Sequence, residues 1–219
     1  MRAERLFALL PLVLLPLSFA ICGEKPAATV SFTLDFPGSN PSHYEIVVGN
    51  DGNGSYTSNG KLDENSDPFD PPTLQFQVDD SVRSQVFDLA KRAHYFSGKV
   101  DSGRKNIANT GTKVLAYKDA SHDSKATYNY SLVQPVDQLT EIFQGLSTTL
   151  ECGRRLTYLH KYEKLALDDE LKRMAELQQE NSLVDIQAIA PELKAIADDS
   201  TVINVSRSRA LRLLATSEK

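Results

Sequence analysis

The sequence predicts an α+β two-layer sandwich, a mostly antiparallel sheet with helices on one face, followed by an all-helical C-terminal extension. The prediction depends on three observations: strand-like alternation before residue 130, two stretches with helical spacing, and no alternation beyond residue 150. We therefore expect the α+β domain to cover residues 29–150 and the extension to cover residues 151–219.

Six short segments alternate apolar and polar residues, the period of a half-buried strand. They lie at residues 30–36, 44–48, around Tyr56, 74–78, 112–117 and 126–132. Turn residues such as Asp51-Gly52 separate consecutive segments, and an Asp-Gly pair between two alternations is a strong hairpin signal. Hairpin connections predict antiparallel pairing.

Two helices are expected within the α+β domain. The first follows Asp79 or Asp80 as N-cap and ends near His94, and the second begins at Pro135, where a missing N–H costs nothing. The spacing of apolar residues indicates that each helix buries one face.

The extension reads as a long exposed helix followed by three shorter ones. Its apolar residues lie among alternating charges: Leu159, Tyr162, Leu165, Met174 and Leu177. Residues 182–215 resemble a single HEAT-type helical repeat, with a helix started by Pro191, an Asp198-Asp199 turn and a second helix. One repeat cannot bury its own face, so we expect it to pack against the preceding helices.

The N-terminus has the pattern of a secretory leader. Arg2 and Arg5 precede an apolar run of twelve residues at 6–17, too short for the about 20 residues that a spanning helix needs. We expect a signal peptide over residues 1–20, with cleavage near Ala20 or before Cys22, and a linker over residues 21–28. The protein is therefore predicted to be exported.

Cys22, at this cleavage point, has three possible fates. It resembles the lipid-modified cysteine of bacterial lipoproteins, which would anchor the chain to a membrane. Alternatively, it forms a disulfide with Cys152, because an exported protein meets an oxidising compartment. In the third interpretation Cys22 is free or is removed with the leader. The sequence leaves all three open.

Composition excludes several classes of function. A formal net charge of −5 argues against a nucleic-acid partner, which would require a basic patch. Two cysteines are too few for a four-ligand zinc site, and the four histidines lack metal-ligand spacing. We therefore predict no metal, no cofactor and no catalytic residues.

Two segments come near to known catalytic patterns. Residues 98–105 have the glycine spacing of a phosphate-binding loop, but Arg104 and Lys105 replace the required Lys and Ser or Thr. Cys152 and His160 suggest a thiol and its base, yet eight residues on one helix place them about 80° apart. Neither pattern predicts an active site.

Residues 29–150 are similar to an uncharacterised family of exported bacterial domains. The matching features are a strand–turn–strand segment with Tyr56 at residues 44–56 and a helix ending in the aromatic pair Tyr95-Phe96. The resemblance implies an export leader or a lipoprotein leader and implies no activity.

Together these observations predict a non-catalytic binding or scaffolding protein of the envelope, with another envelope protein as its partner. It would be periplasmic, or membrane-anchored solely through Cys22, with secretion as the alternative. An exported hydrolase with a site assembled from dispersed residues, and an inhibitor-like module, stay open. A pocket that gathers two or more His, Asp and Cys side chains would favour the hydrolase.

Overall fold

The computed structural model describes residues 27–62 and 73–216. The strands are β1 (Thr29–Asp35), β2 (His43–Gly49), β3 (Asn53–Ser58), β4 (Leu74–Gln77), β5 (Thr112–Lys118) and β6 (Asp123–Tyr128). The helices are α1 (Asp80–Arg92), α2 (Gln134–Tyr162), α3 (Leu167–Gln179), α4 (Ala190–Asp198) and α5 (Asn204–Thr216). Three short 3-10 helices, η1 (His94–Phe96), η2 (Lys164–Ala166) and η3 (Ile186–Ile189), join them.

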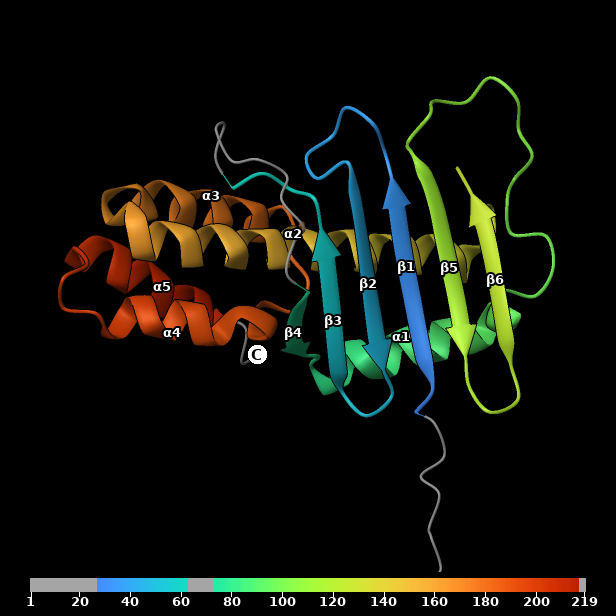
Figure 1. Ribbon diagram of the computed structural model, residues 1–219, viewed down its shortest axis with the longest axis horizontal. Coiled ribbons are helices and arrows are strands. Elements are labelled where there is room, and N and C mark those ends of the chain that lie inside the picture. Colours follow the sequence, from blue (N-terminus) through green and yellow to red (C-terminus); the bar gives the residue numbers. More distant parts are fainter. Residues whose placement is uncertain (1–26, 63–72, 217–219) are drawn as a thin grey trace, which may run out of the picture.

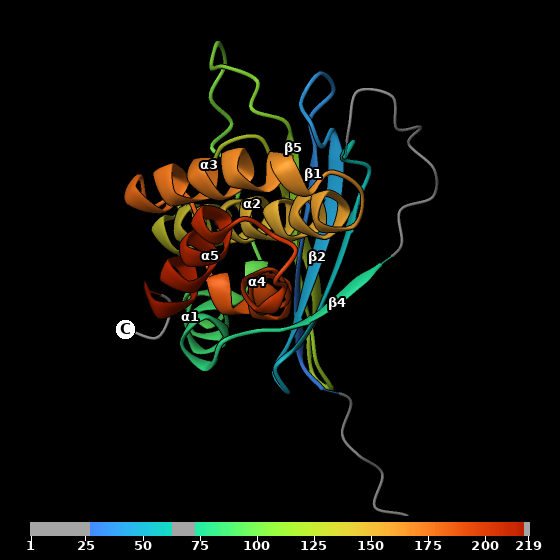
Figure 2. The ribbon, with the colours of Figure 1, turned by 90° about the vertical axis from the view of Figure 1, so that its left-hand side faces the viewer.

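The strands form one antiparallel sheet in the order β4-β3-β2-β1-β5-β6. Helices α1 and α2 lie against one face of this sheet, and Figure 2 shows none of the described helices over the other face. The alternation predicted from the sequence is confirmed, because the inward residues of β1, Val30, Phe32 and Leu34, are all buried. The α+β fold is therefore confirmed, with Asp79 capping α1 through the N–H of Ser81.

Helix α2 connects the two parts of the molecule. It has 29 residues, so it is about 43 Å long, whereas six strands span only about 24 Å between the outermost two. Figure 1 shows α2 crossing behind the sheet and continuing past the β4 edge. The ring of Phe143 stacks on Phe32 of β1 at 5.3 Å and fixes the crossing.

The helices α3, α4 and α5 gather around the protruding end of α2 (Figure 1). Helix α4 contacts α2, and α5 contacts α3 and α4, so the final pair packs on the preceding helices. Two glycines of α2 allow the segment before α4 to approach α2 closely. A Cβ on Gly145 would lie 2.5 Å from Val184, and one on Gly153 would lie 2.5 Å from Ile189.

The extension differs from its predicted form in two ways. Helix α2 runs without interruption through the boundary predicted between residues 150 and 151, so both regions share it. The expected long helix then breaks at Glu163, whose backbone leaves the helical region (φ −141°, ψ 57°). Neither Pro nor Gly marks this break; the chain turns there and α3 packs back against α2.

Because of the break, the apolar residues predicted to share one stripe differ in burial. Met174 is buried, whereas Tyr162 is 62% exposed and Leu165 is 81% exposed. Across residues 27–62 and 73–216, none of the helices combines the length and the apolar composition needed to cross a membrane.

Candidate functional site

Cys152 lies on α2, is fully buried and forms no disulfide within the described residues. Its sulfur accepts hydrogen bonds from Arg173 (3.2 Å) and Arg155 (3.8 Å). Burial raises the pKa of the Cys152 thiol, so it is a poor nucleophile. Cys22 lies outside the described residues, and its lipidation, its pairing with Cys152 and its removal all stay predictions.

The two arginines beside Cys152 also bind Glu170, a buried residue of α3. Arg155 donates to Glu170 at 3.0 Å and Arg173 at 2.6 Å. Burial alone would raise the pKa of Glu170, but the Arg173 hydrogen bond and the Arg155 charge outweigh it and hold that pKa below its usual value. This cluster joins α2 to α3 and leaves its carboxylate fully occupied.

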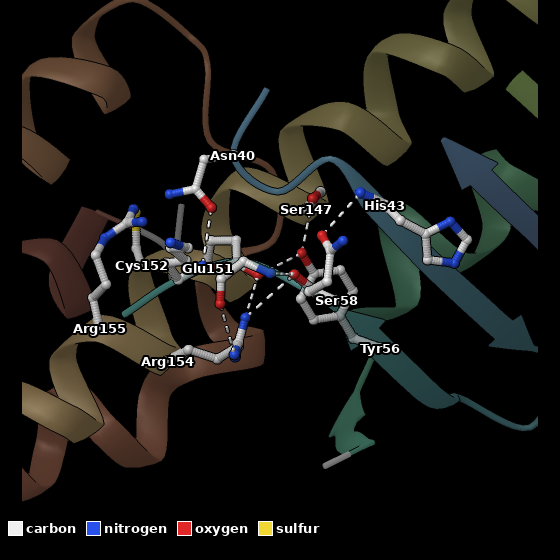
Figure 3. A network of polar contacts seen from close by, with 12 residues as sticks. Asn40, His43, Tyr56, Ser58, Ser147, Glu151, Cys152, Arg154 and Arg155 are labelled. Atoms are coloured by element: carbon white, nitrogen blue, oxygen red, sulfur yellow. Dashed lines mark hydrogen bonds and ion pairs between the residues drawn. The ribbon is translucent and has the colours of Figure 1, made fainter. Parts of the chain in front are cut away.

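A second buried network joins α2 to the sheet (Figure 3). Glu151 accepts hydrogen bonds from the Tyr56 hydroxyl and from Arg154, both at 2.7 Å. Burial, followed by the charge of Glu151, raises the pKa of Tyr56, so the hydroxyl remains a donor. Gly60 leaves space for the Glu151 carboxylate, because a Cβ at that position would lie 2.8 Å from Glu151 Oε2. This geometry indicates a structural role.

The four histidines lie in separate places. His43 on β2 pairs with Asp35, His122 in the β5–β6 turn pairs with Asp119, and His94 lies in η1. Within the part of the chain that the structure describes, no three His, Cys, Asp or Glu side chains are grouped so that they could hold a metal ion.

His160 lines a cavity of about 630 Å³ between α2 and α4, hereafter the α2–α4 cavity. Its lining residues are Leu156, Thr157, His160, Lys161, Lys164, Pro191, Glu192, Ala195 and Asp199. The lining is apolar at Leu156, Pro191 and Ala195 and polar or ionisable elsewhere. It is therefore a site with both hydrophobic surface and ionisable groups, the usual composition of a binding pocket.

Asp199 organises one wall of the cavity. Its Oδ2 accepts from His160 Nε2 (2.9 Å) and from Lys164 Nζ (2.7 Å), while Thr201 donates to Oδ1. The Lys164 hydrogen bond, with those from Thr201 and His160, holds the pKa of Asp199 well below its usual range. Asp199 is thus a fixed anion with every acceptor position in use.

Glu192 lines the same cavity and differs from Asp199 in its hydrogen bonding. Its Oε2 atom is buried and has no hydrogen-bond partner. Burial raises the pKa of Glu192. The same residue, with Thr157 and Lys161, also lines a neighbouring cavity of about 350 Å³ that reaches Leu74 and Tyr162. Glu192 therefore lies between the two cavities, and its Oε2 atom accepts no hydrogen bond.

The lining offers acid–base groups but no activated nucleophile of the hydroxyl or thiol type. Thr157 is the lining residue with a hydroxyl, and it donates to the Gly153 carbonyl at 3.0 Å. Cys152 does not line the cavity.

Sequence reasoning did not identify this site. His160 and Asp199 are 39 residues apart, on different helices, and no spacing rule links them. In the sequence, Lys164 and Glu192 have the pattern of ordinary surface charges on an amphipathic helix. The signal that finds the site is spatial, because it arises when α4 folds back against α2.

No protein-family model matches this chain, and no curated protein matches it. The resemblance of residues 29–150 to a family of exported bacterial domains therefore stays a prediction.

Proposed function

We propose that this protein is an exported, non-catalytic binding or scaffolding module of the cell envelope, and that the α2–α4 cavity receives a side chain of a partner protein. Export rests on the leader pattern of residues 1–20, and Cys22 is the candidate membrane anchor.

One observation carries the proposal: a cavity of about 630 Å³ opens on the part of the molecule that protrudes beyond the sheet. Its volume lies in the range typical of ligand pockets. Next to it in the chain, Tyr162 and Leu165 expose large apolar side chains. Exposed apolar side chains beside a concavity are typical of a docking surface.

The bonding inside the cavity favours binding over catalysis. Asp199 is saturated with donors, Lys164 and His160 are held by it, and Thr157 is tied to the helix backbone. Such groups keep a fixed shape and charge, and a pocket of fixed shape binds with little loss of conformational entropy.

The test is a cavity-filling variant combined with photo-crosslinking in envelope preparations from producing cells. Benzoylphenylalanine replaces the exposed Leu165, and the crosslinked partner is compared with and without Ala195→Trp, which fills the cavity. We expect Ala195→Trp to reduce capture at least about tenfold. Ala120→Trp, on an exposed turn residue distant in sequence, is the control and should leave capture unchanged.

A partner captured equally by Ala195→Trp and Ala120→Trp would refute a role for the cavity. Mass spectrometry of the mature N-terminus tests the anchor separately, because a diacylglyceryl group on Cys22 has a distinct mass. An unmodified terminus beginning at Ile21 would exclude lipidation.

A second candidate function has one specific observation in its favour. The cavity brings together His160 and Asp199, and an imidazole held by a carboxylate is the arrangement of a general base. An exported hydrolase would turn over a panel of ester substrates and lose that activity in His160→Asn. His94→Asn, outside the cavity, is the matched control. Absence of turnover by the purified mature protein would eliminate this candidate.

A further inference from the structure

We propose that the loop of residues 97–111, hereafter the docking loop, binds the surface of an anionic phospholipid membrane. Its cationic side chains contact the headgroups, and apolar side chains beside them enter the bilayer interface. The docking loop lies between η1 and β5. Figure 1 shows it projecting past the end of the sheet where β5 begins, whereas α3, α4 and α5 lie beyond the opposite edge. The inference goes beyond the proposed function, and it relies on the proposed export for access to a membrane.

The docking loop is cationic on a protein of negative net charge. Lys99, Arg104 and Lys105 are its cations and Asp101 is its one acidic residue, whereas the whole chain has a formal charge of −5. Arg104 and Lys105 are exposed, and no carboxylate among the described residues forms an ion pair with either. Two unpaired cations on one loop leave a local positive potential that attracts an anionic partner.

The carboxylate of Asp101 holds the docking loop in shape. Its Oδ1 accepts a hydrogen bond from the N–H of Gly103 at 2.7 Å, and its Oδ2 accepts one from the N–H of Asn129 at 3.0 Å. These hydrogen bonds hold the pKa of Asp101 below its usual value. The Gly103 N–H is therefore already used and does not cradle a phosphate, although residues 98–105 have the glycine spacing of a phosphate-binding loop. An anion is left with the side chains of Arg104 and Lys105.

Exposed apolar side chains gather beside these cations. Within residues 27–62 and 73–150, the large apolar side chains that are exposed are Ile107 (37%), Tyr130 (40%) and Leu132 (57%). Ile107 belongs to the docking loop, and the segment of the other two is tied to it by hydrogen bonds. The Ser102 N–H donates to the Tyr130 carbonyl at 2.8 Å, and the Thr110 N–H donates to Asn129 Oδ1 at 3.0 Å. Apolar side chains that gather in this way, instead of lying singly, mark an interaction surface.

Cations interleaved with tyrosine and aliphatic side chains suit a membrane surface. Anionic headgroups attract lysine and arginine, while tyrosine and leucine are favoured at the boundary between headgroups and acyl chains. Because the docking loop projects from the fold (Figure 1), a planar and deformable surface can reach its cations and its apolar neighbours together. This contact would add to the candidate anchor at Cys22.

The first measurement exploits the lack of tryptophan in the chain. Tyr130→Trp places a single fluorescent reporter beside the docking loop, and Ala120→Trp places one in the β5–β6 turn, at the opposite end of β5. The mature protein, without a lipid on Cys22, is titrated with vesicles of phosphatidylglycerol and phosphatidylcholine in equal parts, and with vesicles of phosphatidylcholine alone. We expect a blue shift of Tyr130→Trp emission with the anionic vesicles only, and no shift for Ala120→Trp.

Cosedimentation with the same vesicles tests the cations. Arg104→Gln combined with Lys105→Gln should weaken binding at least about tenfold, because each cation near an anionic surface contributes about fivefold in affinity. Lys172→Gln combined with Lys194→Gln removes the same charge from exposed positions of α3 and α4 and should leave binding unchanged.

The apolar contribution has its own matched pair of variants. Leu132→Ser should weaken binding to the anionic vesicles about fivefold, because it removes apolar surface that enters the interface. Leu211→Ser on α5 is the control, since Leu211 is 55% exposed and Leu132 is 57% exposed. Equal binding by the two variants would refute the insertion of Leu132.

Equal binding to both vesicle types would overturn the inference, and so would an equal loss in the docking-loop double variant and its lysine control. Preference for polyglutamate over the anionic vesicles would also overturn it, because an acidic protein would then be the partner. Saturable amide NMR shifts of Arg104 and Lys105 with inorganic phosphate, without vesicle binding, would reduce the surface to a site for small anions. Partner capture at the α2–α4 cavity should be unaffected by Arg104→Gln with Lys105→Gln, so failure here leaves the proposed function standing.

Discussion

The two halves of α2 are built on different physical principles. The first half, up to Leu150, faces the sheet and buries aliphatic and aromatic side chains such as Leu139, Phe143 and Leu146 without exposure. The second half begins at Glu151, which still binds Tyr56 of the sheet, and then packs against other helices; it buries two charged networks, one at Glu151 and one at Glu170.

This difference bears on how closely the side chains pack along each half of α2. Close-packed apolar cores have few voids, and changes of even one methylene are felt. The α2–α4 cavity with its unsatisfied Glu192 oxygen lies along the charged half. The sheet half of α2 therefore acts as the scaffold, and the protruding half is where the molecule has space for a ligand.

The largest effect is expected from removing the Phe143 ring, which joins α2 to the sheet. Phe143 is fully buried and stacks on Phe32. Phe143→Ala should cost about 3–5 kcal/mol in the free energy of unfolding, because it removes apolar burial and leaves a void. Urea unfolding measures the loss, with the exposed neighbour Gln144→Ala as control. A loss below about 1 kcal/mol would show that the sheet half is not close-packed.

The second test concerns the buried network at the start of the charged half. Glu151→Ala leaves Arg154, whose side chain is 17% exposed, without its carboxylate partner. Breaking a buried pair from one side is strongly destabilising, and we expect a loss of about 3 kcal/mol in urea unfolding. Glu141→Ala, on the exposed face of the same helix, should be near neutral. Equal values for the two variants would contradict a structural role for Glu151.

A third test separates the two halves by local stability. Gly153→Ala places a Cβ 2.5 Å from Ile189 Cγ2 and forces the segment before α4 away from α2. Overpacking costs about 1–3 kcal/mol, and about 1 kcal/mol is returned by the better helix propensity of alanine. Hydrogen exchange should accelerate in α4 and α5 and remain unchanged in the strands. Uniform acceleration across the molecule would mean that the two halves unfold together.

The smallest effect is expected from the pH dependence of Glu192. Its folded pKa lies above the ordinary glutamate value of 4.5, so the unfolded chain releases this proton first and stability falls as pH rises through that interval. Glu192→Gln should therefore gain stability relative to the unaltered protein above that interval and match it well below.

Thermal unfolding at pH 3 and pH 7 measures this difference. The charged groups around the same cavity are His160, Lys161, Lys164 and Asp199. The His160→Asn variant serves as the control, because it alters a neighbouring lining residue of the cavity and leaves Glu192 in place. A difference between Glu192→Gln and the unaltered protein at pH 3 that equals the difference at pH 7 would contradict the assignment to Glu192.

Local patterns were sufficient for most of the sheet and for the first helix. The alternation around Phe32 and Ile46, the Asp-Gly turn and the Asp79 cap are all interactions within a few residues, and they are found in the structure. Strand β6 begins at Asp123, three residues before the predicted segment. Its first residues are polar and pair with β5, so no hydrophobic alternation predicted that they belong to the strand.

The candidate site was beyond the reach of the same reasoning. Asp199 and Glu192 line the same cavity as His160 and Lys161 only because α4 folds back along α2. The two glycines of α2 that admit the segment before α4, Gly145 and Gly153, have no distinctive local pattern. The break at Glu163 is likewise invisible locally, since it is set by the packing of α3 on α2.

The sequence by itself determined the strand faces, the turns and the helix starts, because period, capping and turn preference act over a few residues. Only the tertiary structure decided that one helix of 29 residues serves both halves, and that the extension forms an open cavity whose lining includes an unsatisfied carboxyl oxygen. Those features depend on helix length relative to sheet width and on contacts between residues far apart in the chain.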